Sequence, residues 1–156
     1  MDDPNIRVRA KLRSLCMRAA EAASIRMSII ERLHHTREPL ILLGDMNDVT
    51  GSVTTQLMSE TGEVNYDKSM RDVALFDAAR IQARYDWMKD VAYTHIYQGM
   101  HEVIDQQFVS EEFLPDSKFS LGQVERVDYF NDHLKWDYAD RVIDHGIIRA
   151  KIKLHS

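Results

Sequence analysis

The first part of the chain carries an apolar stripe with the period of an α-helix. Between residues 7 and 35 the apolar side chains recur at three- and four-residue steps: Val8, Leu12, Leu15, Ala19, Ala23, Met27 and Ile30. This spacing places them on one face of a helix. Pro39 ends any helical continuation. We therefore predict one long amphipathic helix over 7–35 with this stripe as its buried face.

Shorter apolar segments follow this helix. Residues 40–43, LILL, are apolar on both faces and predict a short, fully buried strand. Residues 54–59 predict one or two helical turns. Residues 72–90, DVALFDAARIQARYDWMKD, predict a second helix with a less regular period.

The second half of the chain has the pattern of β-structure. Segments 91–98 and 102–110 flank Gly99 and predict a β-hairpin, and residues 118–130 predict an extended segment bent at Gly122. In segment 146–154 apolar and basic residues alternate, which predicts a strand with one face in water. The order of helix, buried strand, helix and several strands predicts a layered α/β or α+β domain.

Composition and charge narrow the class of protein. The chain has 156 residues, 44% of them hydrophobic and 29% charged, which is typical of one soluble globular domain. No apolar run approaches the roughly 20 residues of a membrane span, so we expect no membrane partner. A net charge of −5 gives no global attraction to nucleic acid. A single cysteine, Cys16, cannot form an internal disulfide, and a cytoplasmic location is the default expectation.

Polar side chains lie at three places in the predicted strands: after the end of one strand, inside a second strand and before the start of the last strand. Gly44-Asp45-Met46-Asn47-Asp48 follows the run 40–43, Asp105 lies within 102–110, and Asp144-His145-Gly146 precedes the last strand. Each segment alone has an ordinary explanation, as a capped turn, an exposed strand residue or a strand start. Carboxylate and amide oxygens are also the ligands that hard divalent cations prefer.

Taken in order, these segments resemble the endonuclease/exonuclease/phosphatase superfamily, the DNase I-like fold of metal-dependent phosphoesterases. The resemblance consists of Gly-Asp-x-Asn after an apolar strand, Ile-Asp-x-x-Phe-Val-Ser at 104–110, and Asp-His-Gly-Ile at 144–147. It runs from about residue 8 to about residue 154. It implies half of a four-layer α/β sandwich, with mixed, mostly antiparallel sheet and two main helices.

The resemblance also implies catalytic roles for the matching residues. Asp45 would orient or deprotonate the attacking water, and Asn47 would donate hydrogen bonds to the phosphate. His145 would contact the phosphate, and Asp105 would hold the His145 imidazole by a hydrogen bond. Asp48 is expected to be a turn residue.

Metal and further substrate contacts are implied in the same way. Asp144, with Asp45, would bind Mg²⁺ or Mn²⁺, the cations that suit carboxylate oxygens. His101 is a candidate for an additional phosphate contact. His95 and His101 form a conceivable zinc pair, but no third and fourth ligands with suitable spacing stand out, so this pair receives no catalytic role.

The chain departs from the family pattern in two ways. Ile143 stands where the family usually has Ser. Nothing precedes the first helix except MDDPN, whereas the family's first half carries an Asn and a Glu that is the main partner ligand for the metal. We therefore expect residues 1–156 to be a single domain equivalent to the C-terminal half of the family domain. Because a lone half would expose core residues, we expect a homo-oligomer or pairing with a missing N-terminal half.

The leading hypothesis for function is a divalent-metal-dependent phosphoester hydrolase, either a nuclease, a phosphodiesterase or a phosphatase. Its substrate would be a phosphate ester, with nucleic acid among the candidates, and the half-domain is expected to be weak or inactive alone. The alternative is a non-catalytic α/β interaction module that keeps the scaffold with half of the active site lost. A third interpretation is an unrelated α+β domain.

Overall fold

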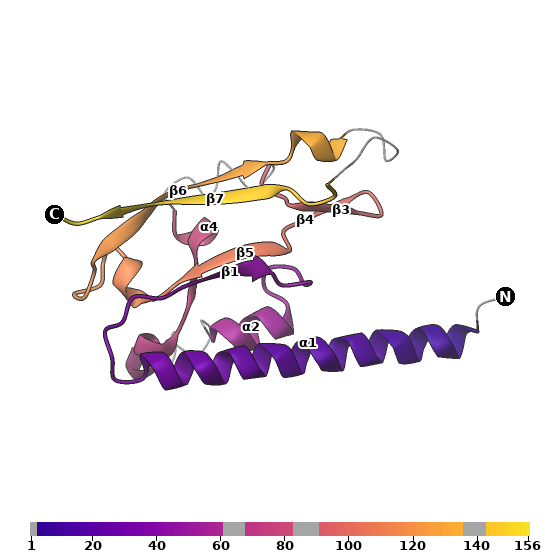
Figure 1. The fold of residues 1–156 in the computed structure, drawn as a ribbon, viewed down its shortest axis with the longest axis horizontal. Helices are drawn as coiled ribbons and strands as arrows, with labels where there is room; N and C mark the ends of the chain where they lie inside the picture. The colour runs from indigo at the N-terminus through magenta and orange to yellow at the C-terminus, as the bar shows by residue number, and fades with distance from the viewer. Residues whose placement is uncertain (1–2, 61–67, 83–90, 136–142) are drawn as a thin grey trace.

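A computed structural model describes residues 3–60, 68–82, 91–135 and 143–156. They form a mixed α/β structure of three layers: the long helix α1 (Pro4–Leu33), a three-stranded antiparallel sheet and a two-stranded antiparallel sheet (Figure 1). The predicted fold class is therefore confirmed. Within these ranges no helix combines the length and the apolarity that crossing a membrane requires.

Helix α1 has clear sequence signals at both ends. The Asp3 side chain accepts a hydrogen bond from the Asn5 backbone N–H at 2.9 Å, and Pro4 occupies the first helical position. The helix ends at Leu33, two residues before His35 turns the chain with a φ of 59°. The predicted helix over 7–35 is thus present and begins three residues earlier than predicted.

The buried face of α1 differs from the predicted stripe. Val8, Leu12 and Leu15 are exposed because this end of the helix extends past the sheet (Figure 1). Further along, the buried positions keep the helical spacing but lie one residue earlier than predicted, at Ala22, Arg26, Ile29 and Leu33. The prediction differs because Arg26 is buried on this face, and a count of apolar positions leaves out a charged residue. Its guanidinium donates to the Val73 carbonyl and pairs with the Glu60 carboxylate.

The sheet next to α1 has the strand order β1-β5-β2. Strand β1 (Ile41–Asp45) and strand β2 (Phe76–Asp77) both pair antiparallel with the central strand β5 (Asp105–Val109). The prediction of a fully buried strand at 40–43 is wrong, because Ile41 and Leu43 are 48% and 66% exposed. Strand β1 is at the edge of this sheet, and only its Leu42 face packs on the core that α1 covers.

The predicted second helix over 72–90 is wrong in its described part. Residues Lys68–Val73 form a 3₁₀ helix, β2 follows, and helix α4 covers only Ala78–Ile81. Val73, Ala74 and Leu75 are buried in succession, which one helix face does not allow. Residues 83–90 lie outside the described residues. Helix α2 (Val53–Ser59) confirms the helical turns predicted over 54–59.

The second sheet pairs strand β6 (Gly122–Phe130) with strand β7 (Ile147–Leu154). The predicted alternation of β7 is confirmed, because Ile148, Ala150 and Ile152 pack on a core while the basic residues between them are exposed. The predicted bend at Gly122 is replaced by a register shift between Val124 and Arg126. Two short 3₁₀ helices, Glu111–Phe113 and Asp132–Lys135, flank β6 in the chain.

The predicted hairpin is present but shorter than predicted. Strand β3 (His95–Tyr97) and strand β4 (Met100–Glu102) pair around Gly99. The segment 102–110 is not one strand, because the chain leaves the hairpin at Val103–Ile104 and continues as β5 in the other sheet. This division carries Asp105 away from the hairpin and places it beside β1.

Candidate active site

The ends of β1 and β5 bring two of the predicted carboxylates together. Asp45 and Asp105 are direct partners in the antiparallel register. The Met46 backbone N–H donates to the Ile104 carbonyl at 2.8 Å, so Asp45 and Asp105 form the pair that lies between ladder hydrogen bonds. The Cα atoms of such a pair approach to about 4.5 Å and their side chains share one sheet face. Segments about 60 residues apart thus place two carboxylates side by side.

His145 joins Asp105 from the loop before β7. Its Nδ1 atom lies 2.9 Å from Asp105 Oδ2, and the two side chains are 31% and 19% exposed. The hydrogen bond that the family resemblance implies is therefore present. It fixes the orientation of the imidazole and leaves Nε2 as the free ring nitrogen.

Thr94 holds the pieces of this site together. Its hydroxyl oxygen is fully buried and accepts the backbone N–H groups of Ile104 and Asp105, at 3.1 Å and 3.0 Å. Its carbonyl accepts the Gly146 N–H at 2.6 Å. One residue therefore ties the hairpin, the start of β5 and the loop that carries His145. A threonine before a strand gives no sequence signal of this role.

The loop before β7 is packed closely on the rest of the site. A Cβ atom added at Gly146 would lie 3.2 Å from the Thr94 Cα and 3.3 Å from the Asn131 Cβ, so glycine permits this approach. Asn131 donates to the carbonyls of Val91 and Tyr93 at 2.8 Å and 2.9 Å. The position of His145 is thus determined by contacts on several sides.

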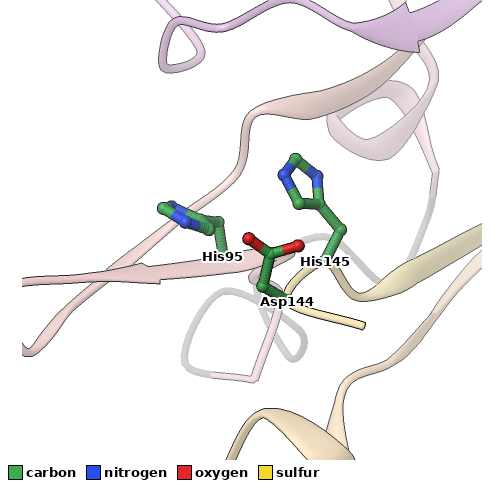
Figure 2. Close-up of side chains that lie close together, drawn as sticks. All are labelled: His95, Asp144 and His145. Carbon is green, nitrogen blue, oxygen red and sulfur yellow. The ribbon is translucent and has the colours of Figure 1, made fainter. Parts of the chain in front are cut away.

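Asp144 and His145 gather with a third side chain, His95 of β3. One potential ligand atom from each residue lies within 4.8 Å of the others, and Figure 2 shows the Asp144 carboxylate directed between the two imidazoles. The ring centroids of His95 and His145 are 5.4 Å apart. Asp45, the second metal ligand that the resemblance implies, does not join this group among the described residues.

The turn after β1 places Asn47 beside Asp45. The Asp45 side chain accepts the Asn47 N–H at 2.7 Å, and Asn47 has a φ of 50°. Asn47 lines a cavity of about 100 Å³ with Arg18 and Thr54. Asp48 is a turn residue, since its carboxylate accepts the Thr54 hydroxyl at 2.6 Å. A contact between Asn47 and a phosphate stays a prediction.

His101 lies apart from the group of His95, Asp144 and His145. In the β3–β4 ladder His95 pairs with Glu102 and His101 pairs with Ile96, so the two histidines lie on opposite faces of the hairpin. The His101 ring stacks on Tyr93 with centroids 4.0 Å apart. The proposed phosphate contact of His101 is therefore not supported by its position and stays a prediction.

Comparison with known proteins shows the fold. No family model and no curated protein matches the chain. The structure is similar to the mannosyl-6-phosphatase Bt3783 of Bacteroides thetaiotaomicron VPI-5482, with a TM-score of 0.54 and 17% sequence identity. The match covers 88% of this chain and 46% of that chain, so this chain spans about half the length of that protein.

Proposed function

We propose that this chain carries part of the active site of a divalent-metal-dependent phosphoester hydrolase of the endonuclease/exonuclease/phosphatase superfamily. The observation that carries this proposal is the Asp105–His145 hydrogen bond, formed directly beside Asp45 at the ends of two paired strands. The similarity of the fold to a phosphatase structure supports a phosphate ester as the substrate.

Each of the grouped residues has a role that its position allows. Asp105 holds the His145 imidazole, and the free Nε2 atom donates a hydrogen bond to a phosphoryl oxygen of the substrate. Asp45, on the same face of the sheet, accepts a proton from the attacking water. Proton transfer and charge stabilisation by such fixed groups account for a large part of enzymatic rate enhancement. Asn47 contributes a further hydrogen bond to the phosphate only if its side chain turns away from α1.

The donor groups fit a divalent cation in part. Asp144 is exposed and supplies the hard oxygen that Mg²⁺ or Mn²⁺ requires. The two imidazoles next to it suit Mn²⁺ and later first-row cations better than Mg²⁺. A cation bound there would neutralise phosphate charge and lower the pKa of a bound water.

The proposal is tested by hydrolysis of an aryl phosphodiester and an aryl phosphomonoester, each with Mg²⁺, with Mn²⁺ and with chelator. We expect weak cation-dependent turnover that His145→Ala reduces about 100-fold or more, the usual cost of losing one hydrogen-bond donor to charge that develops in the transition state. Asp116→Asn removes a carboxylate that is 78% exposed and serves as the matched control. The preferred substrate distinguishes a diesterase from a monoesterase.

Turnover that survives in His145→Ala would contradict the proposal, because it would come from another site or from a contaminant. Absence of turnover in the unmodified chain, with the cation bound, would mean either that the other half of the active site is needed for chemistry or that the chain is a non-catalytic α/β interaction module.

The apolar surface supports a proposal on partners. Leu12 and Leu15 on α1 and Ile41 and Leu43 on β1 are exposed, and β1 has an open edge among the described strands. Such groups are usually covered in a folded protein. We propose that a second copy or an N-terminal half-domain covers them. Sedimentation of the chain as a monodisperse monomer at micromolar concentration would contradict self-association.

A further inference from the structure

The group formed by His95, Asp144 and His145 differs from a chance meeting of polar residues. The three side chains come from the hairpin and from the loop before β7, and their potential ligand atoms lie within 4.8 Å of one another. His95 and His145 are half-buried, while Asp144 is exposed. The two imidazoles are therefore held within the fold, while the Asp144 carboxylate is exposed to solvent.

Each imidazole has a carboxylate on its Nδ1 side. The Nδ1 atom of His145 lies 2.9 Å from Asp105 Oδ2, and the Nδ1 atom of His95 lies 3.9 Å from Glu102 Oε2. Only His145 has a ring nitrogen hydrogen-bonded to a carboxylate, whereas the Nδ1 atom of His95 is buried without a hydrogen-bond partner among the described residues. A carboxylate placed in this way orients the ring of a metal-binding histidine and leaves the other ring nitrogen for the ion.

The backbone around these residues is held rigidly. Thr94, the residue before His95, binds the N–H of Gly146, the residue after His145. The same Thr94 binds the N–H of Asp105, whose side chain orients His145. Because Thr94 is fully buried and binds both segments, the two imidazoles keep their relative position without a bound ion, which lowers the cost of binding one.

We propose that His95, Asp144 and His145 form a three-ligand site for a first-row transition cation of the Zn²⁺ type. Two imidazole nitrogens and one carboxylate suit such cations, whereas Mg²⁺ prefers oxygen ligands alone. Three protein ligands leave a fourth position open on the solvent side for water or a phosphate oxygen, as in catalytic rather than structural zinc sites. His95 becomes a ligand, and this site replaces the phosphate contact that the proposed function gives to His145, because a ring nitrogen bound to the cation has no proton to donate. Binding of the cation itself does not require hydrolysis.

Metal binding can be measured without substrate. Zn²⁺ is titrated against a chromophoric chelator, and Co²⁺ is added separately as a spectroscopic probe, because a site with four or five ligands gives a stronger visible absorption than an octahedral one. We expect binding of one Zn²⁺ per chain, intense Co²⁺ absorption, and no displacement of Zn²⁺ by an equal concentration of Mg²⁺.

Variants locate the bound ion. His95→Gln and Asp144→Asn each remove a ligand and should weaken Zn²⁺ binding by more than about 100-fold, because loss of an orienting partner alone costs about 10–100-fold. Asp105→Asn removes such an orienting partner and should weaken Zn²⁺ binding by about 10–100-fold. His101→Ala removes an exposed imidazole from the opposite face of the same hairpin and should leave the affinity unchanged. Cys16→Ser tests the exposed thiol and should also leave it unchanged.

The results separate the site from its alternatives. Weak Co²⁺ absorption in the unmodified chain, or Zn²⁺ affinity that survives in both His95→Gln and Asp144→Asn, would overturn the proposal. Circular dichroism of each variant shows whether lost binding reflects lost folding, and Asp144→Asn changes an exposed side chain, so it keeps the test valid if His95→Gln unfolds. Zn²⁺ binding without any hydrolysis would confirm the site while contradicting the proposed enzymatic function.

Discussion

The hydroxyl of Thr94 gives a sharp test of how this site is held together. The side chain is fully buried and accepts two backbone N–H groups, those of Ile104 and Asp105. Thr94→Val replaces the hydroxyl by a methyl group of similar size and leaves both donors without their acceptor. Thr94→Ser keeps the acceptor and removes only the methyl group.

The expected costs differ enough to be measured. A buried backbone donor left without a partner costs about 1–3 kcal/mol, so the loss of two in Thr94→Val should cost about 2–6 kcal/mol. Removing one buried methyl group in Thr94→Ser should cost about 0.5–1.5 kcal/mol. Both are large against the total of about 5–15 kcal/mol for a folded domain. In a chain of this length, 1 kcal/mol corresponds to a change of about 2–4 °C in Tm.

Urea unfolding of the two variants and the unmodified chain measures these free energies. The valine variant should be the less stable of the two, although valine is the more apolar residue. It should also bind Zn²⁺ more weakly, because Asp105, which orients His145, loses the hydroxyl that accepts its backbone N–H. If Thr94→Val is as stable as Thr94→Ser, the hydroxyl does not hold β5 to the hairpin and the reasoning is refuted.

Three further changes test other parts of the fold. Burial raises the pKa of the Asp77 carboxyl, so the stability that this group contributes is fully present below its unfolded pKa and is lost as the pH rises through its folded pKa. The Asp77→Asn variant should therefore be more stable than the unmodified chain at pH 7 and should lose this advantage near pH 3. Urea unfolding at both pH values measures the difference. Gly122→Ala should lower stability by about 1–3 kcal/mol, because its Cβ would lie 2.5 Å from a backbone carbonyl oxygen. Gly44→Ala is the control, because no atom lies within 4 Å of its new Cβ and no such loss is expected. Equal Tm values for the two variants would contradict this prediction. Leu33→Ala should cost about 2–5 kcal/mol in urea unfolding, since Leu33 is only 2% exposed in the core under α1, and a loss below 1 kcal/mol would mean that α1 does not pack there.

Several local features follow from the sequence because short-range chemistry decides them. The alternation of β7, the turns of α2 and the hairpin around Gly99 depend on neighbouring residues. Three short motifs also pointed to Asp45, Asp105 and the Asp144–His145 pair, and the Asp105–His145 hydrogen bond is present. The antiparallel register that sets Asp45 opposite Asp105 is consistent with these motifs but is visible only in the fold.

The remaining features depend on contacts between distant segments. Arg26 is buried because Val73 and Glu60 satisfy its guanidinium, and no period of apolar residues reveals a partner 34 or 47 positions away. Segment 72–82 contains residues that favour a helix, but Phe76 and Asp77 form strand β2. They do so because they pair with the edge of β5, and buried contacts outweigh a weak helix propensity.

His95 shows most clearly what tertiary structure added. In the sequence it has no motif and was paired only with His101, which lies on the opposite face of the hairpin. It meets Asp144 and His145 because the Thr94 carbonyl binds the Gly146 N–H and so joins two distant loops. The sequence by itself determined local features such as the alternation of β7 and the turn at Gly99, and it predicted Asp45, Asp105, Asp144 and His145 as candidate site residues. Only the tertiary structure decided which of them meet, because a metal site or a hydrogen-bonded pair depends on distances in space that spacing along the chain does not specify.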